Sequence, residues 1–364
     1  MRRSSTIVVV VVACLLAACS SGTSSARSTV PTTSTVPPTT SASTTTTVAA
    51  TTTGPAPTTP PPPVAPEVGR PDPTGESLTR PALWVKIENT PEARPQTGLD
   101  QADVVYEQVT EAGITRFIAL FNSQVPDVVG PIRSTRAMDS DVVAPLGGVF
   151  AYSGGIPQSV ALISQAPVAA VDETAAHGAM FRDRSKRAPH NLFGHGSDLL
   201  ALGGGQPAPI PPLFSYLPAG QAFAGDPVAA FRVDFDAPYA PIYTYDAASH
   251  TWLRSIGFTP FMAASGQQIA PTNVIVQFVP CCLPVPEGGI YITTGSGEAW
   301  VFSDGKVVKG TWSRSDRSQV TSFVDANNQP IRLNPGPTWV EFVPNGENVD
   351  LLGPADATPP SSTP

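Results

Sequence analysis

Alternating apolar and polar residues predict that the folded body of this chain opens on a β-strand. Residues 82–89 alternate β-branched side chains with tryptophan, lysine and glutamate, the spacing of a half-buried strand. Two further β-rich runs occupy residues 102–110 and 114–122, and their short glycine-containing connection indicates a hairpin. The second run is apolar on both faces except at Arg116, so we expect it to lie centrally in a sheet.

Short helical patterns are interspersed with these strands. Helices are expected at residues 137–146, 157–165 and 197–202, the second of them with a proline in its first turn. A further strand is expected at residues 148–153. The pattern predicts an N-terminal α+β domain, residues 80–210, built on a mixed sheet.

Beyond a proline-rich joint at residues 206–212 the pattern changes to short strands separated by turns. The spacing predicts a mostly β domain, sandwich- or barrel-like, over residues 226–345. A hairpin over residues 299–308 has Asp304-Gly305 at its turn. The other strands are expected at residues 230–235, 242–246, 252–256, 273–278, 290–293, 320–324, 331–333 and 338–343. The fold class is therefore α+β.

The N-terminus has the pattern of an export signal. Arg2 and Arg3 precede 12 apolar residues at 7–18, which as a helix span only about 18 Å, too short to cross a bilayer. The segment Leu16-Ala17-Ala18-Cys19 resembles a bacterial lipobox, and the resemblance implies that Cys19 is lipidated after residues 1–18 are removed. The alternative is an ordinary secretory signal in which Cys19 is incidental.

The next segment has the composition of a tether. Of the 44 residues at 20–63, 33 are Ser, Thr or Pro, so residues 19–66 are expected to form a disordered linker with a stretched length on the order of 130 Å. Its threonine runs suit O-glycosylation. The tail at residues 353–364 is also expected to be disordered. The predicted location is extracytoplasmic, on the cell membrane, through the lipid on Cys19.

Charge and cysteine content narrow the function classes. From Glu67 onward the chain has 18 basic and 29 acidic residues, 18 − 29 = −11, which argues against nucleic-acid binding. Cys281 and Cys282 are adjacent and could form a disulfide in an oxidising compartment or remain as two thiols. No CxxC or metal-binding histidine spacing accompanies them, so neither a metal nor a cofactor is predicted.

Five charged residues concentrate within a short stretch of a chain with only 14% charged residues. They are Glu107, Glu111, Arg116, Arg133 and Arg136. Glu107 and Glu111 are four residues apart and are expected to share a face. One hypothesis is a cleft in which arginines bind phosphate or carboxylate and a carboxylate serves as base. The other is a set of internal ion pairs that fix strand register and the turn after Gly130.

Several motifs resemble the YerB-like family of bacterial lipoproteins, whose members have an N-terminal and a C-terminal part of unknown function. The N-terminal motifs are Ile87-Glu-Asn89, Ala93-Arg-Pro-Gln-Thr-Gly-Leu99, Ala102-Asp-Val-Val-Tyr-Glu107, Gly113-Ile-Thr-Arg-Phe117, Gly130-Pro-Ile-Arg-Ser-Thr-Arg136 and His190-Asn191-Leu192. The C-terminal motifs are Gly295-Ser-Gly297, Asp304-Gly305, Gly310-Thr-Trp312 and Asn334-Pro-Gly-Pro-Thr-Trp339. The resemblance implies a two-domain envelope lipoprotein without assigning a mechanism. Cys281-Cys282 departs from the family pattern.

Histidines add a second group of candidates. His190 and Asn191 fall in a family motif, and a histidine beside a carboxylate can act as general acid or base near neutral pH. His177 and His195 lie in loops rich in glycine and arginine, where a solvated basic loop is the simpler interpretation.

Two functions fit these observations. The first is a binding or scaffold module for an anionic ligand, a cell-wall glycan or an envelope protein. The second is an envelope enzyme acting on phosphate-linked glycans, because residues 114–136 and 152–155 are loosely similar to the LytR-CpsA-Psr phosphotransferases. The aspartate pattern that binds metal in those enzymes does not align. An open pocket with the arginines and an unpaired carboxylate would favour the enzyme, and mutually paired charges would favour the binding module.

Overall fold

The computed structural model describes residues 61–235, 240–281 and 290–353, which belong to one compact unit. The predicted signal peptide, Cys19, most of the tether, Cys282 and the C-terminal tail lie outside the described residues. Among the described residues, no helix is long and apolar enough to cross a membrane.

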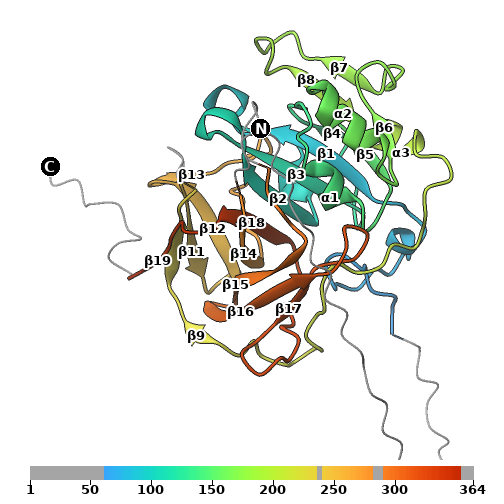
Figure 1. The fold of residues 1–364 in the computed structure, drawn as a ribbon. Coiled ribbons are helices and arrows are strands. Elements are labelled where there is room, and N and C mark those ends of the chain that lie inside the picture. Colours follow the sequence, from blue (N-terminus) through green and yellow to red (C-terminus); the bar gives the residue numbers. More distant parts are fainter. Residues whose placement is uncertain (1–60, 236–239, 282–289, 354–364) are drawn as a thin grey trace, which may run out of the picture. The chain divides into compact units, whose positions relative to one another are not determined.

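An 11-stranded mixed sheet runs through the body (Figure 1). Its order is β17-β16-β15-β14-β18-β2-β3-β1-β5-β6, and β9 pairs with β16. The strands from the N-terminal part are β1 (Leu83–Glu88), β2 (Val104–Val109), β3 (Thr115–Phe121), β5 (Val149–Ala151) and β6 (Ala169–Val171). Those from the C-terminal part are β9 (Asp226–Pro227), β14 (Asn273–Val279), β15 (Gly295–Ser303), β16 (Lys306–Arg314), β17 (Ser322–Val324) and β18 (Thr338–Pro344).

The two predicted domains share this sheet. Strand β18 lies between β14 and β2 and is parallel to both, with Thr338 opposite Val104 and Glu341 opposite Glu107. Strands β2 and β18 are buried along most of their length, as expected for central strands covered on both faces. The proline-rich joint at residues 206–212 therefore connects two parts of one sheet.

Two smaller antiparallel sheets complete the β-structure. The five-stranded sheet has the order β13 (Thr259–Pro260), β12 (Thr251–Ile256), β11 (Pro241–Asp246), β10 (Ala230–Val233) and β19 (Val349–Leu352). The three-stranded sheet has the order β4 (Val128–Val129), β8 (Leu192–His195) and β7 (Met180–Arg182). Both contribute to the hydrophobic core on the face of the large sheet to which Val85 and Phe117 point.

Short helices cover the parallel end of the large sheet, around β1 and β5 (Figure 1). Helices α1 (Asp139–Val143) and α2 (Pro157–Ser164) bury Val143 and Ile163 in the core on the Trp84 face, whereas α3 (Gly196–Ala201) buries Leu199 on the opposite face. Single 3₁₀ turns are η1 (Glu76–Leu78), η2 (Pro91–Ala93), η3 (Leu99–Gln101) and η4 (Glu111–Gly113).

Sequence periodicity located most of these elements. The α+β class, the β2–β3 hairpin, the central position of β3 and the Asp304-Gly305 turn are all confirmed. Two predicted strands are wrong: residues 290–293 and 331–333 form no ladder, and Leu333 makes only an isolated bridge with Tyr216. Their apolar residues pack into the core from loops, so burial there does not depend on strand pairing.

Candidate functional site

The arginine-bearing segment, residues 130–136, lies at the carboxyl edge of the parallel strands. Its backbone hydrogen-bonds to β1 and to the residues after β5. The Arg133 N–H donates to the Lys86 carbonyl at 2.8 Å, and the Arg133 carbonyl accepts from the Ser153 N–H at 2.9 Å. Thr135 N–H donates to the Gly154 carbonyl at 2.9 Å. The carboxyl edge of parallel strands is where open α/β sheets place their binding sites, because loops diverge there.

Glu88, the last residue of β1, is the centre of the first charge cluster. Its carboxylate is buried and lies between an arginine and a histidine, with Oε1 3.0 Å from Arg133 Nε and Oε2 3.0 Å from His190 Nδ1. Arg133 and His190 are 24% and 18% exposed, so both reach solvent from a buried anchor. Nδ1 of the imidazole thus lies against the carboxylate, and Nε2 is the other ring nitrogen that can take part in chemistry.

Glu111 holds the other two arginines. Arg136 donates from Nε to Glu111 Oε2 at 2.9 Å and from Nη2 to Oε1, while Arg116 Nη2 donates to Oε1 at 2.7 Å. Burial alone would raise the pKa of Glu111, but hydrogen bonds and charges from the two arginines lower it. Burial and the neighbouring Arg136 lower the pKa of Arg116 to about 10. Arg116 also donates to the Ser134 carbonyl at 3.0 Å, which fixes the arginine-bearing segment.

A fully buried ion pair lies next to the arginine-bearing segment and contacts it. Lys86 Nζ lies 2.8 Å from Asp139 Oδ1, and neither side chain is exposed. Burial lowers the pKa of Lys86 to about 8 against the opposing effect of Asp139. Asp139 also accepts from Gln108 and Thr135 and from the Arg136 N–H. The sequence analysis did not predict this pair. A lysine within a largely apolar strand is the feature that could have indicated a buried cation in need of a carboxylate.

Glu107 is not part of the arginine cluster. The expectation that Glu107 and Glu111 share a face is wrong, because β2 ends at Val109 and Glu111 lies in the following 3₁₀ turn. Glu107 lies on the opposite face of the sheet, where Arg254 of β12 donates to its Oε2 at 2.7 Å and both side chains are fully buried. Thr115 donates to Glu107 Oε1 at 2.6 Å.

Arg254 lies in an aromatic cage between the five-stranded sheet and the 11-stranded sheet. Its Cζ is 4.2 Å from the ring centre of Phe261, 5.0 Å from that of Trp339 and 5.6 Å from that of Phe117. Its Nε donates to Tyr243 Oη at 3.2 Å. Aromatic faces stabilise a cation that has lost its water, so the cage is a structural element enclosed by the core.

Glu341 shares this enclosed space. Tyr243 Oη donates to Glu341 Oε1, and burial, together with the nearby Glu107 charge, raises the pKa of Glu341 well above its usual value. Neither Arg254 nor Glu341 could be assigned to Glu107 from sequence, since each lies more than a hundred residues away along the chain.

His190 and Asn191 point to different partners. Whereas His190 faces Glu88, Asn191 accepts from Arg182 Nη1 at 3.0 Å and supports the β7–β8 hairpin. His177 and His195 are exposed, and the His195 ring stacks on Phe181 with centres 4.8 Å apart. The structure thus brings His190, but neither of these two, next to a carboxylate of the candidate site.

The candidate site is built from charged residues and a histidine, and Cys281 is not part of it. Cys281 is disulfide-bonded, and Cys282, its predicted partner, lies outside the described residues. Within residues 61–235, 240–281 and 290–353, no group of three or more His, Cys, Asp or Glu side chains is arranged to hold a metal ion.

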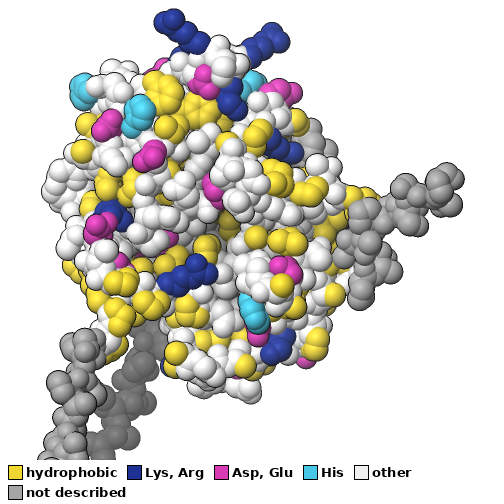
Figure 2. Space-filling model, turned by 180° about the vertical axis from the view of Figure 1, so that it is seen from behind, with side chains coloured by type: hydrophobic (Ala, Val, Ile, Leu, Met, Phe, Trp, Pro, Cys, Tyr) yellow, Lys and Arg dark blue, Asp and Glu magenta, His cyan; other side chains and the backbone are white. Residues whose placement is uncertain are grey.

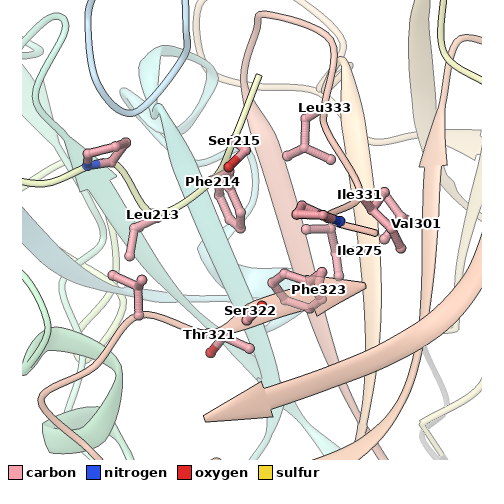
Figure 3. A pocket seen from close by; sticks show the side chains of 13 residues that line it. Leu213, Phe214, Ser215, Ile275, Val301, Thr321, Ser322, Phe323, Ile331 and Leu333 are labelled. Carbon is pink, nitrogen blue, oxygen red and sulfur yellow. The ribbon is translucent and has the colours of Figure 1, made fainter. Parts of the chain in front are cut away.

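An apolar pocket of about 200 Å³ is separate from the charged cluster (Figure 3). Phe214, Ile275, Phe323 and Leu333 point toward one another across it, and Ser215 lies at its side. None of the three candidate arginines lines it, so it offers no support for an arginine-lined catalytic pocket.

Two family models match the chain in consecutive segments. Residues 69–206 match the N-terminal domain, and residues 231–340 the C-terminal domain, of the protein of unknown function family DUF3048. The chain belongs to this family. The arginine-bearing segment, Glu88, Glu111 and His190 all lie in the N-terminal DUF3048 region. Arg254 lies in the C-terminal DUF3048 region, and Glu341 is the first residue after that match.

Relatives agree with this assignment. The chain is 27% identical over 278 residues to the "Putative lipoprotein YerB" of Bacillus subtilis (strain 168), an alignment that covers 73% of this chain and 82% of the relative. The crystal structure of the Bacillus subtilis YerB protein superposes with a TM-score of 0.70 at 22% identity, covering 79% of this chain and 99% of that one. The two chains therefore share a fold over most of their lengths.

Proposed function

We propose that this protein is a membrane-anchored envelope lipoprotein whose N-terminal DUF3048 region binds an anionic group at Arg133, Arg136 and His190. Mutually paired charges in place of an open catalytic pocket favour a binding or scaffold module. The observation that carries the proposal is the Glu88–Arg133 contact, in which the buried carboxylate holds Nε. The terminal nitrogens of a planar guanidinium form a fork that suits phosphate or carboxylate oxygens.

Local charge supports an anion as the ligand. Four cations surround the segment (Lys86, Arg116, Arg133 and Arg136), against three carboxylates (Glu88, Glu111 and Asp139), so the cluster has a net charge of 4 − 3 = +1 before any protonation of His190. The chain from Glu67 onward, with this cluster included, has a net charge of −11. A locally positive site in an acidic protein attracts an anion to one place.

The proposal is tested by replacing Arg133 and titrating inorganic pyrophosphate into the protein. We expect Arg133→Gln to weaken binding at least tenfold, because the forked donor is lost. We expect Arg133→Lys to weaken it less while retaining the charge beside Glu88. Isothermal titration measures the affinity, and thermal unfolding of each variant shows whether the fold survives.

Control and contrary outcomes separate binding from structure. Arg332→Gln removes an exposed cation elsewhere and should leave the affinity unchanged. A parent protein with no affinity for pyrophosphate, combined with strong destabilisation of Arg133→Gln, would assign the arginines to structural ion pairs alone.

The enzyme alternative rests on His190 and Glu88. An imidazole oriented by a buried carboxylate can accept a proton from water as the water oxygen attacks phosphorus and a phosphate group departs. Phosphorus NMR during the pyrophosphate titration would detect orthophosphate release. Release that depends on His190 would replace the binding module by a hydrolase.

Membrane anchoring is proposed to depend on the lipid on Cys19. We expect Cys19→Ala to shift the protein from the membrane fraction to the soluble fraction, since a single short apolar segment cannot replace a lipid anchor. Cys14→Ala, within the signal, is the matched control and should stay with the membrane. Fractionation followed by immunoblotting checks both, and a Cys19→Ala protein that sediments like the parent would exclude the lipoprotein assignment.

A further inference from the structure

The β7–β8 hairpin carries the densest group of cations in this acidic chain. Within residues 182–187 there are four basic residues and one acidic residue. The basic residues are Arg182, Arg184, Lys186 and Arg187. Lys and Arg side chains project from the top of the body in Figure 2, where Figure 1 places this hairpin. A concentration of positive charge on a projecting element is unexpected in a body whose net charge is −11.

Most of this charge is not neutralised by the protein. Arg182 pairs with Glu173 at 2.7 Å. The only acidic residue of the loop, Asp183, is turned back into it, where it accepts from the Ser185 N–H and hydroxyl. Arg184 and Arg187 are exposed and have no ion pair within the described part of the chain. Their guanidinium groups are therefore free to meet an external anion.

The hairpin loop continues directly into the candidate site. His190 N–H donates to the Arg187 carbonyl at 2.9 Å, so the loop's last turn joins an exposed cation to the residue that contacts Glu88. Arg133 lies on the other side of that carboxylate. The exposed cations of the loop are thus connected through His190 and Glu88 to Arg133, and we call this set of residues the strip.

We propose that this strip binds a linear polyanion with repeating phosphate groups, one anionic group at Arg133 and its neighbours along Arg184, Lys186 and Arg187. The inference rests on the proposed anion site. An exposed cation outside a pocket contributes little to binding affinity by itself. Several such cations contribute more when they bind the same ligand chain. A flat membrane surface would meet the exposed arginines but not Arg133 and His190, which are recessed at 24% and 18% exposure.

The experiment compares a short and a long polyphosphate on the full-length protein. The hairpin variant Arg184→Glu/Arg187→Glu is matched by Lys309→Glu/Arg332→Glu, which makes the same change of −4 in charge at exposed positions on the C-terminal part. Affinity for inorganic pyrophosphate and for long-chain polyphosphate is measured by titration at two salt concentrations, since contacts to exposed charges weaken with screening.

We expect the parent to bind long-chain polyphosphate at least tenfold more tightly than pyrophosphate. The hairpin variant should lose that gain while its pyrophosphate affinity stays within threefold, and the control should keep the gain. An equal loss in the control would show a general charge effect and overturn the inference. Retention of vesicles of anionic phospholipid, with no preference for polyphosphate, would assign the hairpin to a membrane surface and also overturn it.

Failure of the proposed function gives a different result. If the parent does not bind pyrophosphate and Arg133→Gln gives the same titration as the parent, the proposed anion site is rejected. A parent that binds pyrophosphate through Arg133 but has no hairpin-dependent gain with polyphosphate rejects only the extended strip.

Discussion

Replacing Arg254 with methionine should lower the free energy of unfolding by about 3–5 kcal/mol, because it leaves Glu107 buried without its cation. Methionine fills much of the same volume, so the loss measures charge and cage contacts more than a cavity. The effect is a large part of the stability of a typical protein. Chemical denaturation followed by tryptophan fluorescence measures it, since Trp339 forms part of the cage.

Arg232→Met is the matched control for this variant. Arg232 pairs with Asp350 at 2.5 Å, but the two side chains are 45% and 43% exposed. An exposed pair contributes at most about 1 kcal/mol, so this variant should be nearly as stable as the parent. If Arg254→Met lost no more than Arg232→Met, the cage would not be holding the two sheets together.

Lys86→Met should have the second large effect, again about 3–5 kcal/mol, because Asp139 would remain fully buried without its cation. Asp139 also accepts from the Arg136 N–H and from Thr135, so the arginine-bearing segment should loosen as well. We therefore expect weaker pyrophosphate binding in addition to lower stability. Denaturation and titration of the same sample measure the two effects, and Lys309→Met, an exposed lysine, should show neither.

The difference in stability between the parent and Lys86→Met should depend on pH in one direction. The pKa of Lys86 is about 8 in the folded protein against 10.5 ordinarily, so the unfolded chain binds more protons between those values. Stability from this group consequently rises with pH from about 8 toward 10.5. The parent should gain stability over Lys86→Met in that range. A difference that shrinks there would contradict the buried position of Lys86.

Local patterns in the sequence predicted what depends on neighbouring residues. Alternation located β1, and β-rich runs located β2 and β3. Apolar residues on both faces of residues 114–122 placed β3 centrally, and Asp304-Gly305 marked the turn between β15 and β16. The same kind of reasoning concentrated attention on Arg116, Arg133 and Arg136, which the structure brings to one edge of the sheet. The export signal and the tether are also predictions from local composition, because neither needs a folding partner to be recognised.

Only the tertiary structure determines which acidic residue forms an ion pair with which basic residue. Glu107 is within nine residues of Arg116 in sequence, yet it pairs with Arg254, and Glu88 rather than Glu107 anchors Arg133. Alternation assigns a side chain to a face but does not say what covers that face. The insertion of β18 beside β2, and the packing of β12 over it, come from distant contacts between strands that are individually similar. Strand order is set by the burial of both sheet faces in the whole chain, which short-range periodicity does not encode.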